Sequence, residues 1–243
     1  MTDLDLEVVP EDWERCLAVV AHPDDLEFGA ACALARWTRQ GKTVVEVLAT
    51  RGEAGIDGMA PDEAARVRTA EQEASAAVVG ASAVEWLDHP DGMLQPRLDL
   101  RRDLARAIRR HRPDVVVTLS FREGFWGGGP MWNHVDHRVL GEAVVDAVRD
   151  AANRWVFPEL VDEGHEPWGG VRFVLVASSP RATHYTDVTD TLDVGIASLE
   201  AHRAYLDGLG YDLAPDPFLR SLTEPTGQRL GIGAALTFEL IAS

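Results

Sequence analysis

Short apolar runs alternate with longer amphipathic stretches along most of this 243-residue chain. The apolar runs are rich in β-branched residues and predict strands at residues 16–21, 43–49, 84–87, 115–119 and 173–177. The amphipathic stretches often have acidic residues or proline near their starts and predict helices at residues 29–40, 61–79, 99–111 and 134–152. Strand and helix therefore follow one another in a repeating order.

The continuously apolar strands indicate a sheet that is buried on both faces. Because long crossovers between strands require parallel pairing, we expect an α/β fold, a three-layer sandwich with a mostly parallel, doubly wound sheet. The length suits a single domain over residues 1–243, since one core stops growing above about 250 to 300 residues. Frequent proline and glycine with weak periodicity predict little regular structure at residues 153–170 and 206–233.

The amino-acid composition argues against two classes of binding partner, nucleic acids and membranes. The chain carries 23 basic and 40 acidic side chains, a formal net charge of −17, which repels nucleic acid phosphates and anionic lipid. We therefore expect no nucleic acid and no membrane partner, and neither a basic secretion signal nor an apolar run of roughly 20 residues is visible. The only two cysteines, Cys16 and Cys32, lie in apolar stretches and predict buried thiols in a cytoplasmic protein.

The first predicted strand leads directly into a cluster of ligand-type side chains. In doubly wound sheets, ligands bind outside the carboxyl ends of the strands, and here His22, Asp24 and Asp25 occupy that place. Pro23 favours an extended backbone at His22, so the two adjacent carboxylates fall at a helix start and should point differently. Capping of that helix is the alternative role, and one carboxylate can cap and bind a metal only by dividing its two oxygens.

A second cluster, His134, Asp136 and His137, opens the predicted helix at residues 134–152. Two histidines three residues apart lie on one helical face, although such histidines can also be merely exposed. Together, His22, Asp25 and His137 supply two nitrogens and one oxygen, a set that holds catalytic zinc and leaves a fourth position for water. We therefore expect one zinc ion per chain, although another divalent first-row metal could use the same ligands.

These clusters occur within motifs that resemble the PIG-L/LmbE-like family of zinc-dependent N-deacetylases. The segments at 21–29, 50–55, 68–71, 91–92 and 134–137 carry the resemblance, and they read AHPDDLEFG, TRGEAG, RTAE, DG and HVDH. The resemblance covers most of the chain. Val135 replaces the commoner proline of the last motif, and residues 201–205 lack the Ser-Gln often seen there, which weakens inferences about oligomer contacts and specificity.

The resemblance implies a Rossmann-like fold and a role for each motif residue. It implies that His22, Asp25 and His137 bind the metal, that Asp24 is the general base, and that His134 assists at the carbonyl. It also places Arg68 near the pocket rim as a substrate anchor, although an ordinary surface ion pair is the alternative. From its position, Asp136 could orient either histidine ring of this motif, and our hypothesis is that it fixes the tautomer of His134 and favours its protonated form.

A glycine-rich stretch at residues 122–133 contains two tryptophans and predicts a mobile surface loop that borders the pocket. Trp126 and Trp132 could stack on a sugar ring or an aromatic acyl chain, or form a hydrophobic plug. Self-association of the chain is left open.

We therefore expect a zinc-dependent hydrolase that removes an acyl group, in the first instance acetyl, from the amide nitrogen of an amino sugar or related small molecule. Two alternatives remain. An amidase that cleaves a larger amide or thiol conjugate would use the same metal residues. A non-catalytic sugar- or nucleotide-binding module would have no need for Asp24 beside three ligands, and no GxGxxG motif follows the first strand.

Overall fold

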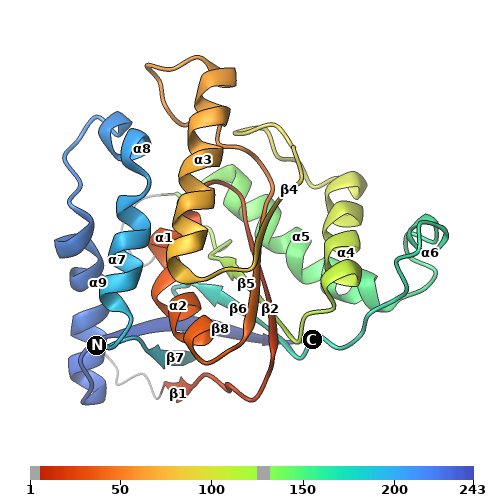
Figure 1. Cartoon of the computed structure of the whole chain (residues 1–243). Coiled ribbons are helices and arrows are strands. Elements are labelled where there is room, and N and C mark those ends of the chain that lie inside the picture. Colours follow the sequence, from red (N-terminus) through yellow and green to blue (C-terminus); the bar gives the residue numbers. More distant parts are fainter. Residues whose placement is uncertain (1–5, 125–131) are drawn as a thin grey trace.

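The computed structural model describes residues 6–124 and 132–243, and in this part of the chain one sheet lies between two layers of helices (Figure 1). Its strands are β1 (Glu7–Val8), β2 (Arg15–Val20), β3 (Thr43–Leu48), β4 (Ala83–Trp86), β5 (Val115–Leu119), β6 (Phe173–Ala177), β7 (His184–Asp187) and β8 (Ala235–Ala242). Its helices are α1 (Asp25–Gly29), α2 (Ala31–Arg39), α3 (Pro61–Val79), α4 (Leu98–His111), α5 (Val135–Ala152), α6 (Glu159–Asp162), α7 (Leu192–Glu200), α8 (Arg203–Gly208) and α9 (Pro215–Leu230).

The sheet has the strand order β1-β7-β8-β6-β5-β2-β3-β4. All neighbouring strands pair in parallel except β8, which is antiparallel to both β6 and β7. The chain runs outward from β2 to β4, returns to β5 on the other side of β2, and continues to β6. The switch in direction lies between β2 and β5, where ligands bind in sheets of this type.

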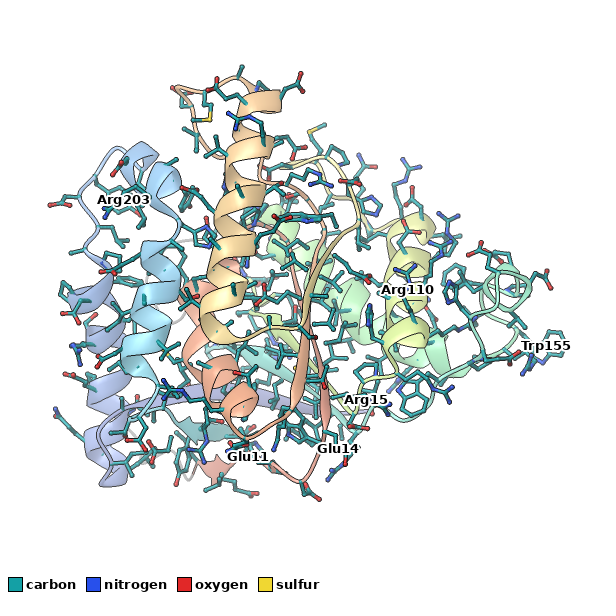
Figure 2. All side chains as sticks on the ribbon, in the orientation of Figure 1. Glu11, Glu14, Arg15, Arg110, Trp155 and Arg203 are labelled. Carbon is teal, nitrogen blue, oxygen red and sulfur yellow. The ribbon has the colours of Figure 1, made fainter. Side chains whose placement is uncertain are left out.

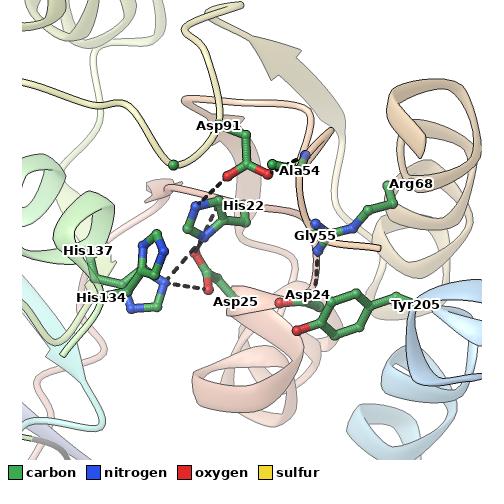
Figure 3. Close-up of a pocket in the computed structure, with 11 residues that line it drawn as sticks. His22, Asp24, Asp25, Ala54, Gly55, Arg68, Asp91, His134, His137 and Tyr205 are labelled. Carbon is green, nitrogen blue, oxygen red and sulfur yellow. Dashed lines mark hydrogen bonds and ion pairs between the residues drawn. The ribbon is translucent and has the colours of Figure 1, made fainter. Parts of the chain in front are cut away.

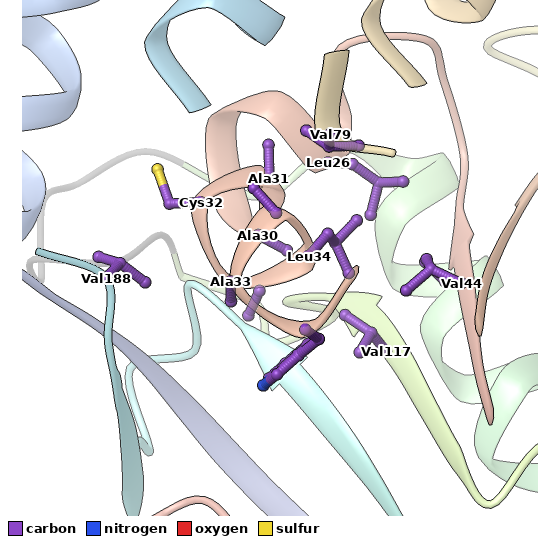
Figure 4. Packing of buried hydrophobic residues seen from close by; sticks show 14 of the residues in the cluster. Leu26, Ala30, Ala31, Cys32, Ala33, Leu34, Val44, Val79, Val117 and Val188 are labelled. Atoms are coloured by element: carbon purple, nitrogen blue, oxygen red, sulfur yellow. The ribbon is translucent and has the colours of Figure 1, made fainter. Parts of the chain in front are cut away.

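Two hydrophobic clusters fill the spaces between the sheet and its helices. One lies under α1, α2, α7 and α9, and the other under α4 and α5. Small residues at the start of α2, among them Ala30, Ala31 and Ala33, belong to the first cluster (Figure 4). Charged side chains such as Arg110 and Arg203 project from the outside of the molecule (Figure 2). The α/β sandwich with a mostly parallel sheet is therefore confirmed.

The five predicted strands all occur, each displaced by one residue or less at either end. The predicted helix at 29–40 corresponds to the last residue of α1 followed by α2, and α5 begins one residue after His134, which caps it. The two cysteines are unpaired and buried, as predicted. None of the helices in the described part of the chain is both long and apolar enough to cross a membrane.

The prediction of little regular structure at 206–233 is wrong, because α9 occupies most of this region. Pro215 starts the helix at a position where proline is tolerated, but Pro225 lies inside it. The buried residues of α9 are Leu219, Thr223, Thr226 and Gly227, so only one of them is large and apolar. The short helix α6 lies within residues 153–170, where little regular structure was predicted as well. The elements α7, α8, β1, β7 and β8 were not predicted from the sequence.

Candidate metal centre

The predicted chemistry meets at the carboxyl ends of β2, β3, β4 and β5, around a cavity of about 250 Å³ (Figure 3). The loop after β2 supplies His22 and Asp24, and α1 begins with Asp25. The loop after β4 supplies Asp91, while His134 and His137 come from the start of α5, which follows β5 in the chain. The cavity is also lined by Ala54, Gly55, Arg68, Gly92 and Tyr205.

His22 is held by carboxylates on one side of its ring. Its Nε2 lies 3.0 Å from Asp91 Oδ1 and 3.2 Å from Asp136 Oδ2, so the Nε2 proton is donated to these oxygens. Asp136 also accepts hydrogen bonds from the backbone N–H groups of Gly92 and Leu94, at 2.7 and 3.1 Å. When the His22 ring is neutral, its Nδ1 atom therefore carries a lone pair, and this lone pair faces the interior of the cluster.

His137 is oriented in the same manner by an amide. Its Nδ1 lies 3.0 Å from Asn133 Oδ1. The identity of that oxygen follows from the other end of the amide, because Asn133 Nδ2 donates to the carbonyl oxygens of Ser120 and Arg122 at 2.6 and 3.0 Å. His137 therefore donates its Nδ1 proton to Asn133, and its Nε2 is a second lone pair directed at the cluster.

The two lone pairs meet beside Asp25. His137 Nε2 lies 3.3 Å from His22 Nδ1 and 3.0 Å from Asp25 Oδ1, and Asp25 Oδ2 lies 3.5 Å from His22 Nδ1. Ligands about 2.0 to 2.1 Å from a tetrahedral zinc ion lie about 3.3 to 3.4 Å from one another. The distance between the two ring nitrogens matches this spacing, and the Asp25 carboxylate lies beside both of them, so the chemistry of these donors fits a zinc ion.

The two carboxylate oxygens of Asp25 have different partners, as expected if one oxygen binds the backbone and the other binds a metal ion. Oδ2 accepts hydrogen bonds from the backbone N–H groups of Ala21 and His22 at 3.1 and 2.9 Å, while Oδ1 faces His137. Burial opposes a charge on His22, but the carboxylates of Asp25, Asp136 and Asp91 hold its pKa well above the usual value. The cluster therefore favours a positive charge at its centre.

Two groups of donors among the described residues lie close enough together to hold a metal ion, and neither includes Asp25. In one, ring nitrogens of His22, His134 and His137 all lie within 4.8 Å of one another. In the other, His22 Nε2 lies close to Asp91 and Asp136. In this second group, the His22 N–H and three backbone N–H groups already donate to the carboxylates, so their charge is partly compensated. The three-histidine group shares its two innermost members with the cluster around Asp25.

Asp24 precedes α1 and has a left-handed backbone, with φ at 83°, which is uncommon for a residue other than glycine. Its side chain makes no capping hydrogen bond, so the capping role is wrong for this acid. Oδ2 instead accepts a hydrogen bond from Arg68 Nη2 at 2.5 Å, and the backbone N–H donates to Gln72 Oε1 at 3.0 Å. Burial raises the pKa of Asp24 to about 7, although the Arg68 charge opposes the shift.

Arg68 is neither a surface ion pair nor a residue at the rim, because only 2% of it is exposed. Besides Asp24, it donates to the carbonyl oxygens of Gly52 and Pro23 at 2.8 and 2.6 Å. The ring of Tyr205 lies 4.4 Å from its guanidinium carbon. Arg68 is thus a buried cation that holds Asp24 and not a surface ion pair, and because it also lines the cavity its contact with substrate stays a prediction.

Gly55 makes room for this arginine, since a Cβ built there would lie 2.2 Å from Arg68 Nη1. We expect Gly55→Ala to lower the free energy of unfolding by about 1 to 3 kcal/mol, because the overpacked guanidinium must leave its hydrogen bonds. Urea denaturation measures this loss. Gly58→Ala is the matched control in the same loop, where a Cβ would meet nothing within 4 Å. Equal stability of the two variants would contradict the proposed packing.

His134 is the N-cap of α5, and its Nδ1 accepts a hydrogen bond from the backbone N–H of Asp136 at 3.2 Å. The ring therefore keeps a proton on Nε2 when neutral. Partial burial and the charges of His22 and His137 lower the pKa of His134. The expectation that Asp136 orients a protonated His134 is wrong, because the Asp136 carboxylate contacts His22 instead.

Trp132 is 62% exposed, and its ring lies 5.3 Å from the guanidinium carbon of Arg138. Among the described residues it lines neither the cavity at the cluster nor the larger one beside it, so its contact with substrate stays a prediction. Trp126 and most of the predicted glycine-rich loop lie outside the described residues. The sequence interpretation missed Asn133, Gln72 and Tyr205, and it assigned no role to Asp91.

A cluster of histidines and carboxylates at the switch point of a parallel sheet is the kind of site that metal-dependent hydrolases use. The model of the PIG-L family, described as GlcNAc-PI de-N-acetylase, matches residues 17–148. The chain therefore belongs to this family of metal-dependent N-deacetylases, as the resemblance of its motifs predicts.

Individual relatives agree with this assignment. The chain is 26% identical to a diacetylchitobiose deacetylase of Thermococcus kodakarensis over 90% of its own length and 80% of the relative's. It is 32% identical to a 1D-myo-inositol 2-acetamido-2-deoxy-alpha-D-glucopyranoside deacetylase of Kineococcus radiotolerans, over 57% of the chain but 45% of that protein. The N,N'-diacetylchitobiose deacetylase of Pyrococcus horikoshii has the same fold, with a TM-score of 0.81 at 23% identity over 96% of this chain and 85% of that one.

Proposed function

We propose that the chain is a zinc-dependent hydrolase that removes an acyl group from the nitrogen of an amino sugar, with the ion held by His22, Asp25 and His137. The observation that supports this most is the meeting of His22 Nδ1 and His137 Nε2 beside the Asp25 carboxylate, with separations of 3.0 to 3.5 Å, in a cluster that favours a positive charge. A zinc ion bound there supplies Lewis acidity, which activates water and polarises an amide carbonyl.

Asp24 is the proposed general base. It lines the cavity next to the ligand Asp25, and Arg68 engages its Oδ2, so Oδ1 is the oxygen that accepts the proton of the attacking water. In the complete reaction, water adds its oxygen to the carbonyl carbon while the carbon–nitrogen bond breaks. Asp24 can then return the proton to the departing nitrogen, so the products are a carboxylic acid and an amine.

His134 is the proposed donor to the oxygen that becomes negative. Because its Nδ1 accepts the capping N–H, a neutral ring presents Nε2–H, and a fixed donor of this kind stabilises charge that develops in the transition state. The lowered pKa of His134 accords with a neutral donor rather than with a protonated acid. Because His134 then transfers no proton, Asp24 is the group that takes the proton from water and returns it to the departing nitrogen.

The amino-sugar assignment rests on the polar cavity and on the relatives. Arg68, Asp91 and Tyr205 line this cavity and offer both donors and acceptors to a polyhydroxylated ring. The substrates named for the two deacetylases above are N-acetylated sugars. An amidase for larger conjugates would use the same metal residues and differ in the surrounding loops.

The function is tested by incubating zinc-reconstituted protein with a panel of N-acetyl sugars, thiol conjugates and larger amides, with detection of the free amine. We expect amine from N-acetylglucosamine derivatives and loss of this activity after treatment with a chelator. Amine from the conjugates alone would establish the amidase instead. Amine from none of them, in protein shown to carry zinc, would contradict both hydrolase assignments.

His134→Ala should retain zinc while kcat falls by roughly 10² to 10⁴, the range for removal of a positioned donor. KM should change little, and steady-state kinetics with a metal assay separates these effects. His134→Asn is the control for the helix cap, because its side-chain oxygen can still accept the capping N–H. Loss of zinc from both variants would favour the three-histidine group as the metal site, and unchanged turnover would leave His134 without a catalytic role.

A further inference from the structure

A second, larger cavity of about 440 Å³ adjoins the cluster and shares Asp24, Asp25, His137 and Tyr205 with the polar cavity. Away from these shared residues, its walls are mainly apolar or aromatic. The side chains concerned are Phe28, Leu119, Tyr211, Leu213, Phe218 and Leu222. They come from α1, the end of β5, the segment after α8, and α9. The proposed metal site therefore lies between a polar cavity and an apolar one.

The apolar walls are packed against each other. The rings of Phe28 and Phe218 meet edge to face, with centroids 5.4 Å apart. Leu222 lies one helical turn further along α9, on the same face as Phe218. Ser120, Asn133 and Ser178 are the polar members outside the shared residues, and Asn133 is already engaged with His137 and backbone carbonyls. This lining suits hydrocarbon better than hydroxyl groups.

An amide has two substituents, and a trans amide directs them away from each other across the scissile bond. With the carbonyl carbon beside Asp24 and the metal ligands, the sugar on the nitrogen fits the polar cavity, and the acyl chain then enters the apolar one. A methyl group, about the size of a water molecule, occupies roughly 30 Å³, whereas a cavity of about 150 Å³ already holds benzene. The observed 440 Å³ far exceeds what an acetyl group needs.

We propose that this cavity is an acyl-chain subsite, and that the preferred substrates carry a medium-length aliphatic or aromatic acyl group on the amino-sugar nitrogen. The inference rests on the proposed function and names the substrate class of the same site. It assigns α9, which lies far from the metal-binding motifs in the sequence, to substrate selection.

The subsite is tested by titrating zinc-loaded protein with the carboxylic acid products, acetate, butyrate, hexanoate and octanoate, in a calorimeter. We expect the dissociation constant to fall by about fourfold for each methylene that leaves water, so octanoate, if its chain is fully buried, should bind on the order of 10³-fold more tightly than acetate. Equal affinities along the series, or weaker binding of the longer chains, would overturn the proposal.

Two cavity variants and one control variant show which residues cause the dependence on chain length. Leu222→Trp should fill part of the cavity and flatten the dependence on chain length, while Leu230→Trp, on the same helix but not among the lining residues, should preserve it. Tyr211→Ala, at a residue that is 62% exposed and therefore safe for folding, should weaken octanoate binding and leave acetate binding unchanged. A chain-length dependence that survives both cavity variants would also overturn the proposal.

The outcome is separable from that of the proposed function. N-octanoylglucosamine and N-acetylglucosamine are assayed in parallel for released amine, and we expect the octanoyl compound to have the higher kcat/KM. Amine from the acetyl compound together with a flat carboxylate series would refute the subsite alone. A steep carboxylate series that depends on Leu222, without amine from either compound, would support the subsite and contradict the hydrolase.

Discussion

Asp24→Asn is expected to reduce kcat by roughly 10² to 10⁴ while the protein still binds one zinc ion, because the amide cannot accept the proton of the attacking water. Asparagine tolerates the left-handed backbone of this position and keeps an oxygen for Arg68, so the change removes a base with little other disturbance. Turnover under saturating substrate and zinc content of the same sample are the measurements.

Asp25→Ala is the control for Asp24→Asn, because it alters a proposed zinc ligand instead of the proposed base. Asp25→Ala should lose tight zinc binding and activity together, since it removes a proposed ligand oxygen. If Asp24→Asn loses the ion as fully as Asp25→Ala does, the roles of the two adjacent acids are reversed. If Asp24→Asn instead retains wild-type turnover, the base is another group.

His22→Ala and His137→Ala should each weaken zinc binding by more than about 10²-fold, because loss of a mere outer partner of a ligand already costs 10-fold to 100-fold. Removing one of three protein ligands leaves too few donors to hold the ion against water. Competition with a chromogenic chelator measures the affinity, and amine release should disappear at zinc concentrations that saturate the wild type.

His165→Ala is the matched control, because His165 lies between α6 and β6 and does not line the cavity at the cluster. It should bind zinc as the wild type does. Undiminished zinc affinity in both site variants would remove the basis of the proposed centre.

The strands and the cluster of donor side chains around His22 could be predicted because their signals are local. Buried parallel strands are apolar throughout, and the motif around His22 follows one of them directly. The adjacent acids Asp24 and Asp25 do point differently, one to Arg68 and the other to His137. Local backbone geometry at the end of β2 and the start of α1 therefore accounts for that prediction.

The partners of these residues could not be predicted, because they come from distant parts of the chain. His22 contacts Asp91 and Asp136 only in the folded chain, and no periodic pattern in the sequence relates these three residues. Sequence proximity was misleading for Asp136 and His134, since side chains two residues apart do not face each other at a helix start. The burial of Arg68 likewise depends on the close approach of Gly52 and Gly55, which belong to a different loop.

The apolar cavity could not be predicted from the sequence. Its walls belong partly to α9, in which apolar residues such as Phe218 and Leu219 alternate with buried threonine and glycine, so the sequence gives no clear hydrophobic stripe. A helix of this kind is stabilised by its tertiary contacts rather than by its own pattern. Features that govern substrate choice were therefore harder to predict than the proposed metal ligands.

Anomalous diffraction at the zinc absorption edge, from crystals of the zinc-loaded protein, locates the ion and its ligands. We expect one strong peak about 2.0 to 2.1 Å from His22 Nδ1, His137 Nε2 and a carboxylate oxygen of Asp25. A peak held instead by His22 Nε2 with Asp91 and Asp136, or one that includes His134 and excludes Asp25, would contradict the proposed zinc site.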